Sequence, residues 1–522
     1  MAASIDKIRH PDYMVELPYM LRAWDVYRGG RHAITPAVNR TMVGRWTSDL
    51  RPDAQGQGTT QADADSERQR QRRLIYERTA EQSYICSHVR ESKNEYDDRV
   101  ARAMHLPFFR SIVDIYVSAV LRTDPSSEGP TGDPWATYWA DADMAGTQHA
   151  ELMRIALTLA LVQNKSFVVV DKPAITQPAS SRAEQIERGE RAYAYVLSAA
   201  DLVDWALDSR GRFLWAKVRE DAPDERDPDK EADGGCDQYR VWYPDRWELH
   251  RSGEEDAIVG AHSFGRVPIV PLFARRGHES RRTLASDGVL ADIVDIDLAI
   301  YNHLSLFHEQ LFTQVFSQLA VPMESGEVPD LELGVQRVLG FSAEGGGRPM
   351  YLSPDSAILT AQLASLKDHI AWGRQLASVS RGRAEYSKEE RSAASLQEES
   401  SDKNNAITSL VGAVERCDRE VHELIAIAEG QSSVPQRTYS RDVSLKALSS
   451  QIADATSLSA LMPPPAAMAE LLRPIFARAL REHGAGEDAI KRADEAITAA
   501  IEAGEREPAD VGEVEEGEDG GS

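Results

Sequence analysis

The sequence has little cysteine and no long apolar run. Its 522 residues include three cysteines, Cys86, Cys236 and Cys417, which are far apart and form no CxxC motif. Three cysteines cannot build a disulfide framework, so a reducing compartment is expected. The longest uncharged stretch, residues 455–469, contains three prolines and is shorter than the ~20 apolar residues of a membrane span. The sequence therefore predicts a soluble chain with no membrane partner.

Motifs of catalysis are also missing. The chain contains no GxxxxGK[ST], GxGxxG or GxSxG pattern, which argues against the common nucleotide-binding loops and the serine-hydrolase elbow. His308-Glu309 begins like a zinc-protease motif, but Phe312 stands where the second histidine ligand must lie. We therefore expect no enzyme activity, no metal and no cofactor.

Positive charge is scarce. The chain carries 59 Lys and Arg against 84 Asp and Glu, a formal net charge of −25. Binding of nucleic acid over a broad face needs clustered Lys and Arg, so this balance argues against such a face. The tail after Gly504 has eight acidic residues and one Arg, and with almost no apolar residue it is predicted to be disordered.

What the chain does contain indicates a globular protein of mainly helical character. Hydrophobic residues make up 42% and charged residues 27% of the sequence, which is typical of a folded domain. Short β-rich runs interrupt the helical patterns, for example SFVVV at 166–170 and VPIVPLF at 267–273. The prediction is an α+β fold, mainly α, with a small β module around residues 166–273.

An apolar seam of about 30 residues is the most informative pattern. Its members recur every three or four residues from Val289 to Val315, which predicts a helix of roughly 45 Å. A helix this long in a soluble chain must find partners along its length, from the same chain or from identical neighbours. The seam residues with the clearest spacing are Ile293, Ile296, Ile300, Leu304, Phe307 and Leu311.

Two further long helices are predicted downstream, at residues 353–379 and 391–430. Ser353-Pro354 is a suitable start for the first of them. The short loop that separates them contains glycine and is positive in an acidic protein, with Arg381, Arg383 and Lys388. A second basic cluster precedes the first long helix; salt bridges to acidic groups and contact with a phosphate backbone explain it equally well. That cluster consists of Arg275, Arg276, Arg281 and Arg282.

The order of these parts resembles the portal proteins of tailed bacteriophages. The resemblance spans roughly residues 8–429. Related chains often have Gly before the SFVVVD-type strand, where this chain has Asn164 and Lys165. The stretches that carry the resemblance are His10-Pro11-Asp12-Tyr13 with Gly29-Gly30, Tyr96 to Pro125, Ser166 to Pro173, Leu202 to Glu220, His262 to Phe273, and the long helix from Asp287 onward.

The resemblance implies a portal-type subunit that assembles as a ring. Its parts would be an N-terminal wing region at 1–285, a first stem helix at 286–318, a small α/β clip at 319–352, a second stem helix at 353–379, a tunnel loop at 380–390, a long wing helix at 391–430, a helical crown at 431–503 and the acidic tail at 504–522.

The resemblance also implies a function without catalysis. Twelve copies would form the head–tail connector at one capsid vertex of the virion, through which double-stranded DNA is packaged and ejected. The ring would assemble in the host cytoplasm with major capsid and scaffolding proteins, and would bind the terminase large subunit and later a head–tail adaptor protein. On this interpretation Arg381, Arg383 and Lys388 touch passing DNA, and the seam of the first stem helix packs between subunits.

Two alternatives remain from the residues alone. Asp292, Asp295 and His303 could belong to a metal-dependent nucleic-acid hydrolase, or the chain could be a helical scaffold that oligomerises without a channel. The three carboxylates Asp292, Asp295 and Asp297 are better explained as the solvated face of an amphipathic helix.

Overall fold

A computed structural model of the chain describes residues 8–30, 84–86, 91, 93–173, 189–221, 237–251, 256–276, 283–286, 288–314, 318–323, 339–342, 348–352, 356–377, 393–440, 473, 491–496 and 498. The chain divides into two units, Met1–Val443 and Ser444–Ser522. Described residues of the second unit are helical, and there Arg473 pairs with Asp494 at 3.0 Å. Among the described residues no helix is long and apolar enough to cross a membrane.

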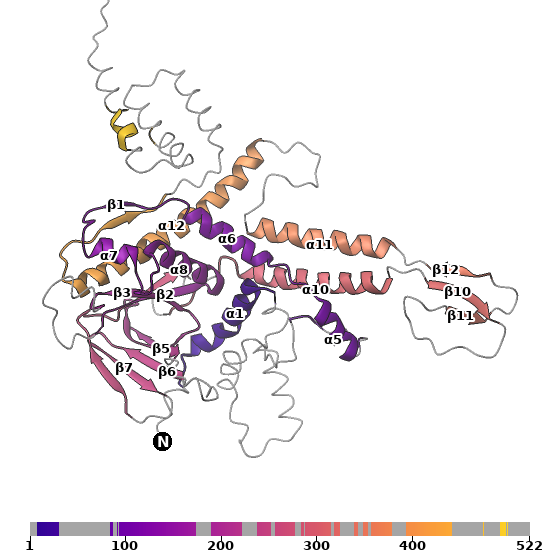
Figure 1. Cartoon of the computed structure of the whole chain (residues 1–522), viewed down its shortest axis with the longest axis horizontal. Helices are drawn as coiled ribbons and strands as arrows, with labels where there is room; N and C mark the ends of the chain where they lie inside the picture. The colour runs from indigo at the N-terminus through magenta and orange to yellow at the C-terminus, as the bar shows by residue number, and fades with distance from the viewer. Residues whose placement is uncertain are drawn as a thin grey trace, which may run out of the picture. The chain divides into compact units, whose positions relative to one another are not determined.

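Two antiparallel sheets form the β module of the first unit (Figure 1). Their strand orders are β4-β5-β6-β7-β8 and β3-β2-β9. The strands are β2 (Lys165–Asp171), β3 (Tyr193–Ser198), β4 (Leu202–Leu207), β5 (Phe213–Asp221), β6 (Asp237–Trp242), β7 (Arg246–Arg251), β8 (Ile258–Ala261) and β9 (Ile269–Phe273). All seven residues of β2 are buried, which explains why its central part, Phe167–Val170, is a continuous apolar run rather than an alternation.

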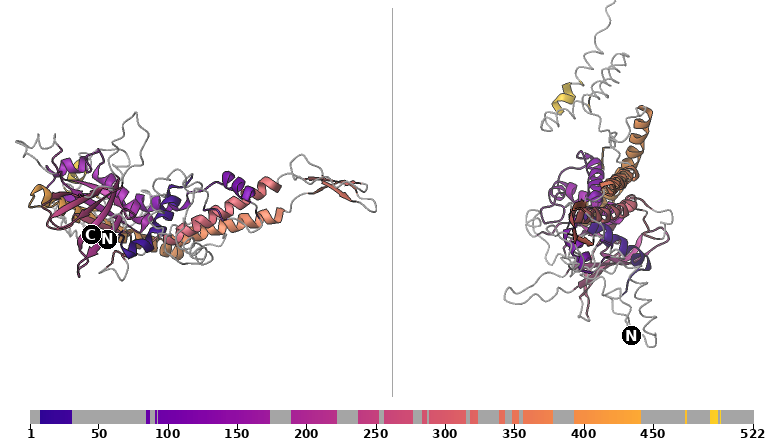
Figure 2. Two further views of the ribbon diagram at one scale, coloured as in Figure 1. Left: turned by 90° about the horizontal axis from the view of Figure 1, so that it is seen from below. Right: turned by 90° about the vertical axis from the view of Figure 1, so that its right-hand side faces the viewer.

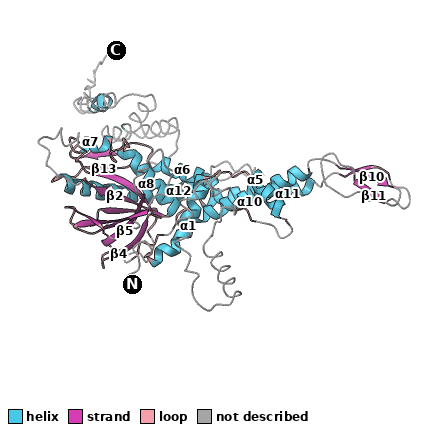
Figure 3. Ribbon diagram, turned by 60° about the horizontal axis from the view of Figure 1, so that its bottom comes forward, coloured by secondary structure: helices cyan, strands magenta, loops and turns pink. Residues whose placement is uncertain are grey.

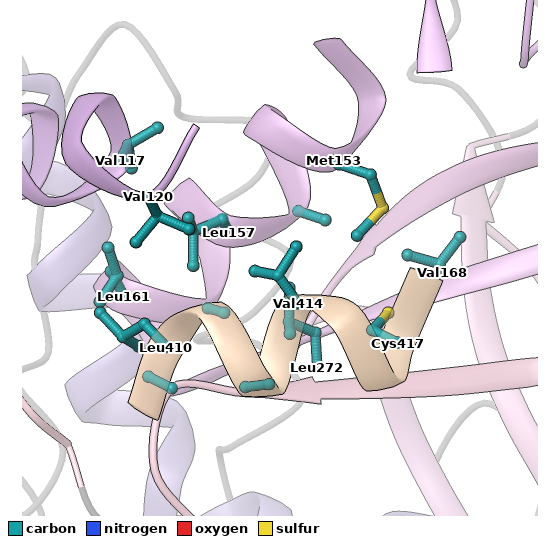
Figure 4. Close-up of a cluster of buried hydrophobic side chains, with 14 of the residues drawn as sticks. Val117, Val120, Met153, Leu157, Leu161, Val168, Leu272, Leu410, Val414 and Cys417 are labelled. Atoms are coloured by element: carbon teal, nitrogen blue, oxygen red, sulfur yellow. The ribbon is translucent and has the colours of Figure 1, made fainter. Parts of the chain in front are cut away.

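Helices cover the three-stranded sheet and build the main core. They are α1 (Pro11–Arg28), α6 (Phe108–Val120), α7 (Trp135–Ala140), α8 (His149–Gln163) and α12 (Ala393–Glu429), whereas α5 (Lys93–Arg102) packs in a separate small core with Tyr301. Figure 4 shows Leu410 and Val414 of α12 facing Leu157 of α8, with Val168 and Leu272 of the sheet beside them. The mixture of helices and sheets confirms the predicted α+β class.

A pair of long helices leads away from the sheets within the first unit (Figures 1 and 3). It consists of α10 (Ala291–Gln314) and α11 (Ser356–Leu376), joined through β10 (Gln318–Met323), β11 (Leu339–Ser342) and β12 (Met350–Leu352). β10 is the central strand of this small sheet. Because Gln318 pairs with Leu352, the end of α10 lies next to the start of α11.

The two helices are antiparallel, as Figure 2 also shows. Near the body, a Cβ on Gly373 of α11 would lie 3.2 Å from Ile296 of α10 and 2.5 Å from the ring of Phe108. Farther out, the rings of His303 and His369 are 4.7 Å apart. The absence of a side chain at Gly373 thus lets α11 approach both α10 and the start of α6.

The seam of α10 is buried by the chain itself. Ile300 and Leu304 form a core with Leu366 of α11, and Ile296, Phe307 and Ile370 pack against it. Ile293 belongs to the main core, and Leu311 is half-buried. The same chain therefore supplies contacts to the buried members of the seam. Packing of the partly buried members between subunits stays a prediction.

The expected helical region from residue 431 begins differently. Residues 436–438 form β13 (Gln436–Thr438), which pairs antiparallel with β1 (Ser126–Glu128). Tyr439 then enters the main core and is 3% exposed. α12 ends at Glu429, and Gly430 follows it with a φ of 64°, a conformation that favours glycine and stops the helix. The segment after it is thus a strand paired with β1.

Candidate functional site

The residues predicted to touch DNA are only partly described. Arg275 and Arg276 are exposed after β9, and Arg276 forms an isolated bridge with Ser286. Arg281 and Arg282 lie outside the described residues, as do Arg381, Arg383 and Lys388 between α11 and α12. Their role in DNA contact therefore stays a prediction.

The carboxylates of α10 do not converge on a metal. Asp292 is exposed, and Asp295 pairs with Arg22 of α1 at 3.1 Å. His303 lies about two turns farther along α10 than Asp295, where it faces His369. The residue set that the hydrolase alternative requires is therefore not assembled.

Asp297 corrects the solvated-face interpretation. It is fully buried, accepts a hydrogen bond from the backbone N–H of Phe109 at 2.7 Å, and lies 2.9 Å from Nε2 of His105. The N-cap residue of α6 is Pro107, which has no side-chain hydrogen bond to offer. Asp297 of α10 instead accepts the hydrogen bond of a backbone N–H in the first turn of α6, which has no partner within the helix. It attaches the base of the two-helix pair to the body.

A second attachment uses a buried guanidinium. Arg99 of α5 is 2% exposed, and it donates to Glu91 at 2.6 Å, to Oγ of Ser305 on α10 at 3.0 Å and to the carbonyl of Cys86 at 2.9 Å. Hydrogen bonding to Glu91 raises the pKa of Arg99, so the guanidinium remains charged. The middle of α10 is therefore tied to α5 and to the carbonyl of Cys86 by buried polar contacts.

A cluster of histidine and aspartate lies elsewhere in the core. His149 of α8 and Asp418 and His422 of α12 offer ligand-type atoms within 4.8 Å of one another, and all three side chains are no more than 1% exposed. The sequence reasoning missed this cluster. The available signal was the spacing of Asp418 and His422, which places them one turn apart on the same face of the predicted helix.

The hydrogen bonds of the cluster assign its tautomers. Nε1–H of Trp139 donates to Nε2 of His422 at 2.9 Å, so Nδ1 of His422 carries the proton and donates to the Asp418 carbonyl at 2.7 Å. The carboxylate of Asp418 accepts from Nε2 of His149 at 2.6 Å and from the hydroxyl of Tyr439 at 3.1 Å. Nδ1 of His149 is left to accept from the hydroxyl of Tyr138 at 3.1 Å.

This network does not fit a metal ion. An indole N–H is only a donor, so Trp139 occupies the one lone pair of neutral His422. A metal on Nε2 of His422 would displace the N–H of Trp139. A metal on Nδ1 of His422 would move the ring proton to Nε2, where it would point at the N–H of Trp139. His149 and Asp418 alone offer too few ligands for a closed site. The cluster is a structural network that joins α7, α8, α12 and Tyr439.

The charge states follow from burial. Burial lowers the pKa of His149 to about 4, so this histidine is neutral near pH 7. Burial alone would raise the pKa of Asp418, but the electrostatic attraction and hydrogen bonds of the N–H groups of His149 and His422 outweigh it and hold that pKa below its usual range. The network therefore contains one ionised carboxylate whose donors are all in place.

We predict that the protein loses stability as pH falls from 6.5 to 4. The unfolded chain protonates His149 near its ordinary pKa of 6.5, whereas the folded chain keeps it neutral down to about 4. The unfolded state thus binds more protons in this window, and about 3 kcal/mol of the free energy of unfolding is lost.

Urea titrations at several pH values measure this effect. The variant His149→Gln keeps a donor for Asp418 and an acceptor for Tyr138 but does not titrate, so its pH dependence should be flatter. The control His308→Gln removes a half-buried histidine of α10 and should keep the wild-type profile. Equal slopes for wild type and His149→Gln would contradict the assignment.

Three exposed apolar side chains lie on one side of α11, with the polar residues Gln362, Ser365 and His369 between the first and the second; we call the three apolar side chains the apolar stripe of α11. Ile358, Trp372 and Leu376 are 49%, 56% and 60% exposed. Their spacings of 14 and 4 residues place them on one side of the helix, about a quarter turn from the residues that face α10. The ring of His369 lies 5.2 Å from that of Trp372 on the same side. An exposed stripe with a tryptophan is typical of a contact surface.

A cavity of about 500 Å³ lies between α1 and α8. Its walls include the apolar side chains of Trp24, Ile155 and Leu159. Asp201 and Arg219 also line it and pair with each other at 2.9 Å. These walls suit an apolar group better than reactive chemistry.

Comparison with known proteins gives distant likenesses only. No family model matches the chain, and no curated protein matches it. Solved structures that are similar include a chain from the neck of an empty gene transfer agent (GTA) particle computed with C6 symmetry, with a TM-score of 0.35 and 12% identity over 68% of this chain and 85% of that chain.

Two further similar chains come from related particles. One is from the neck of the native GTA particle computed with C12 symmetry (TM-score 0.34, 13% identity, 67% of this chain and 83% of that chain). The other is from the virion of the native particle (TM-score 0.31, 13% identity, 67% and 84%). At these scores the likenesses carry no argument about this chain.

Proposed function

We propose that the chain is the subunit of a phage-type portal, a ring through which double-stranded DNA passes at one vertex of a capsid. The observation that carries the proposal is the antiparallel pair α10–α11 with an apolar stripe on α11. Such a stripe on a projecting helix pair needs a partner, and identical copies in a closed ring supply one to every subunit.

The charge of the chain suits a conduit. Twelve copies at −25 each would carry about −300, which repels phosphate from most of the surface. DNA can then slide without adhering, and only a short basic loop needs to hold it. We assign that loop to residues 380–390, with Arg381, Arg383 and Lys388 as the contacts.

The partners of the ring follow from the same proposal. The small sheet β10–β12 lies at the end of the helix pair farthest from the body, where it would be the docking surface for the terminase large subunit and later for a head–tail adaptor protein. ATP hydrolysis would belong to the terminase. Major capsid and scaffolding proteins would surround the body, and the ring would be part of the virion.

We predict that reversing the charge of the loop impairs packaging. The double variant Arg381→Glu/Arg383→Glu replaces weak attraction of phosphate by repulsion, and the DNA content of assembled heads should fall several-fold. The matched control Arg210→Glu/Arg212→Glu reverses two exposed arginines between β4 and β5 and should package normally. Quantifying DNA in purified heads decides the matter.

The same experiment separates the proposal from its rival. A scaffold without a channel would form particles whose DNA content is indifferent to both variants. Wild-type DNA content in heads that contain the loop variant would refute the role of the loop.

A further inference from the structure

The cavity between α1 and α8 has no part in the proposed portal function. Its volume is about 500 Å³, which is larger than any single side chain and within the range of roughly 300–1,000 Å³ that small-molecule sites occupy. α1 contributes Leu21 and Trp24, α8 contributes Ile155 and Leu159, and Val196 of β3 completes the apolar walls. Three elements thus surround a mostly apolar space of ligand size.

The polar groups at one end of the cavity are paired with one another. Gln163, the last residue of α8, accepts through Oε1 from the hydroxyl of Ser198 at 2.8 Å and from the N–H of Ala199 at 3.0 Å. Asp201 donates its backbone N–H to the carbonyl of Ser198, and its carboxylate pairs with Arg219 at 2.9 Å. These groups are therefore already committed within the wall.

The other uncharged and acidic groups of the walls are engaged as well. The hydroxyl of Thr158 donates to the carbonyl of Arg154 at 2.8 Å. Asp25 accepts from the hydroxyl of Tyr84 at 3.2 Å, and the hydroxyl of Tyr27 donates to a carboxylate of α6 at 3.2 Å. A ligand would gain little from these groups, because each would have to give up a partner.

The side chain of Arg154 differs from the rest of the wall. It is exposed on α8, and no residue that the structure describes forms a hydrogen bond or an ion pair with its guanidinium. Positions 154 and 163 are about 13 Å apart along the axis of α8, so Arg154 lies at the end of the cavity opposite Gln163. A guanidinium binds a carboxylate through two parallel N–H donors.

We propose that this cavity binds a medium-chain monocarboxylic acid, with the carboxylate at Arg154 and the alkyl chain along Ile155 and Leu159 toward Gln163. The single unpaired cation calls for one anionic group, and the apolar walls call for a body without polar atoms, since a buried polar atom without a partner costs free energy. The length of about 13 Å between the two ends suits an extended chain. The inference does not depend on the formation of a ring.

Isothermal titration calorimetry of the full chain with hexanoate, octanoate and decanoate tests the apolar part of the site. The affinity should rise about fifteenfold from each acid to the next, because each buried CH₂ group contributes about fourfold. An affinity that does not change with chain length, or the absence of saturable binding, would overturn the proposal.

The variant Arg154→Gln tests the anionic part. It should weaken the binding of octanoate about tenfold through the loss of a charge-assisted hydrogen bond, and it should leave the binding of octanol, which has no charge, as in the wild type. The control Arg416→Gln removes the same charge from an exposed position of α12 and should bind octanoate normally. Octanoate binding that is unchanged in Arg154→Gln, or reduced equally for octanol, contradicts the assignment of the carboxylate to Arg154.

The variant Ile155→Trp tests the location. Ile155 is 43% exposed, so an indole can enter the cavity from its open side, and the affinity for octanoate should fall at least tenfold. A folded variant that binds octanoate like the wild type would place the ligand elsewhere and overturn the site; if the variant does not fold, the comparison of Arg154→Gln with Arg416→Gln decides. Binding by a chain that forms no ring would overturn the proposed function and leave this inference intact.

Discussion

Replacing Trp372 and Leu376 together with glutamate is expected to convert the assembled protein into monomers. The two side chains are 56% and 60% exposed in the isolated chain and belong to the stripe on α11. Burying such side chains against a neighbour contributes about 1.5–3 kcal/mol each. Two unpaired carboxylates in their place would add the cost of desolvation. In a ring, each interface between two subunits contains both substitutions, so each interface loses this free energy of association.

Sedimentation velocity measures the change. The double variant should sediment as a monomer at concentrations where the wild type is fully assembled, with the same unfolding midpoint as the wild-type monomer, because both positions are exposed. The control Leu214→Glu alters a residue of β5 that is 51% exposed and should leave assembly unchanged. A double variant that still assembles like the wild type would remove α11 from the interface.

The largest loss of stability is expected for Asp418→Ala. The substitution leaves the donors of His149 and Tyr439 without their acceptor inside the core. Breaking a buried polar network by removing one member costs about 3–5 kcal/mol. The connection between α8, α12 and the segment after β13 should loosen with it.

Equilibrium unfolding in urea checks this prediction. The control Asp368→Ala removes an exposed aspartate of α11, and its free energy of unfolding should lie within about 0.5 kcal/mol of the wild type. A loss below about 1 kcal/mol for Asp418→Ala would mean that the network contributes little and that α12 is held by its apolar contacts alone.

Local patterns in the sequence anticipate the long helices well. The predicted helices at 286–318 and 353–379 correspond to α10 at Ala291–Gln314 and α11 at Ser356–Leu376. The apolar run SFVVV corresponds to the buried strand β2. Periodicity and composition are properties of residues that are close in the sequence, so they can be recognised without knowledge of the fold.

Contacts between distant residues were not predictable in this way. The seam of α10 has the same spacing whether it packs on α11 or on another subunit, and Asp297 has the same sequence context whether it is solvated or caps α6. Asp418 and His149 are 269 residues apart. Only the tertiary structure shows that His149 donates a hydrogen bond to Asp418.

The candidate site was likewise predictable only where a local pattern in the sequence points to it. The sequence points to Arg381, Arg383 and Lys388 through their local positive charge, and this assignment needs no fold. The apolar stripe of α11 was not recognised, because Ile358, Trp372 and Leu376 follow helical spacing as core residues do. Only their exposure, once α10 covers the neighbouring face, distinguishes them from a core.

Electron microscopy of the purified protein tests the central claim most directly. The account predicts closed rings with a central hole, in which the α10–α11 pairs of adjacent subunits lie side by side. Compact monomers, or open filaments without a channel, would contradict it.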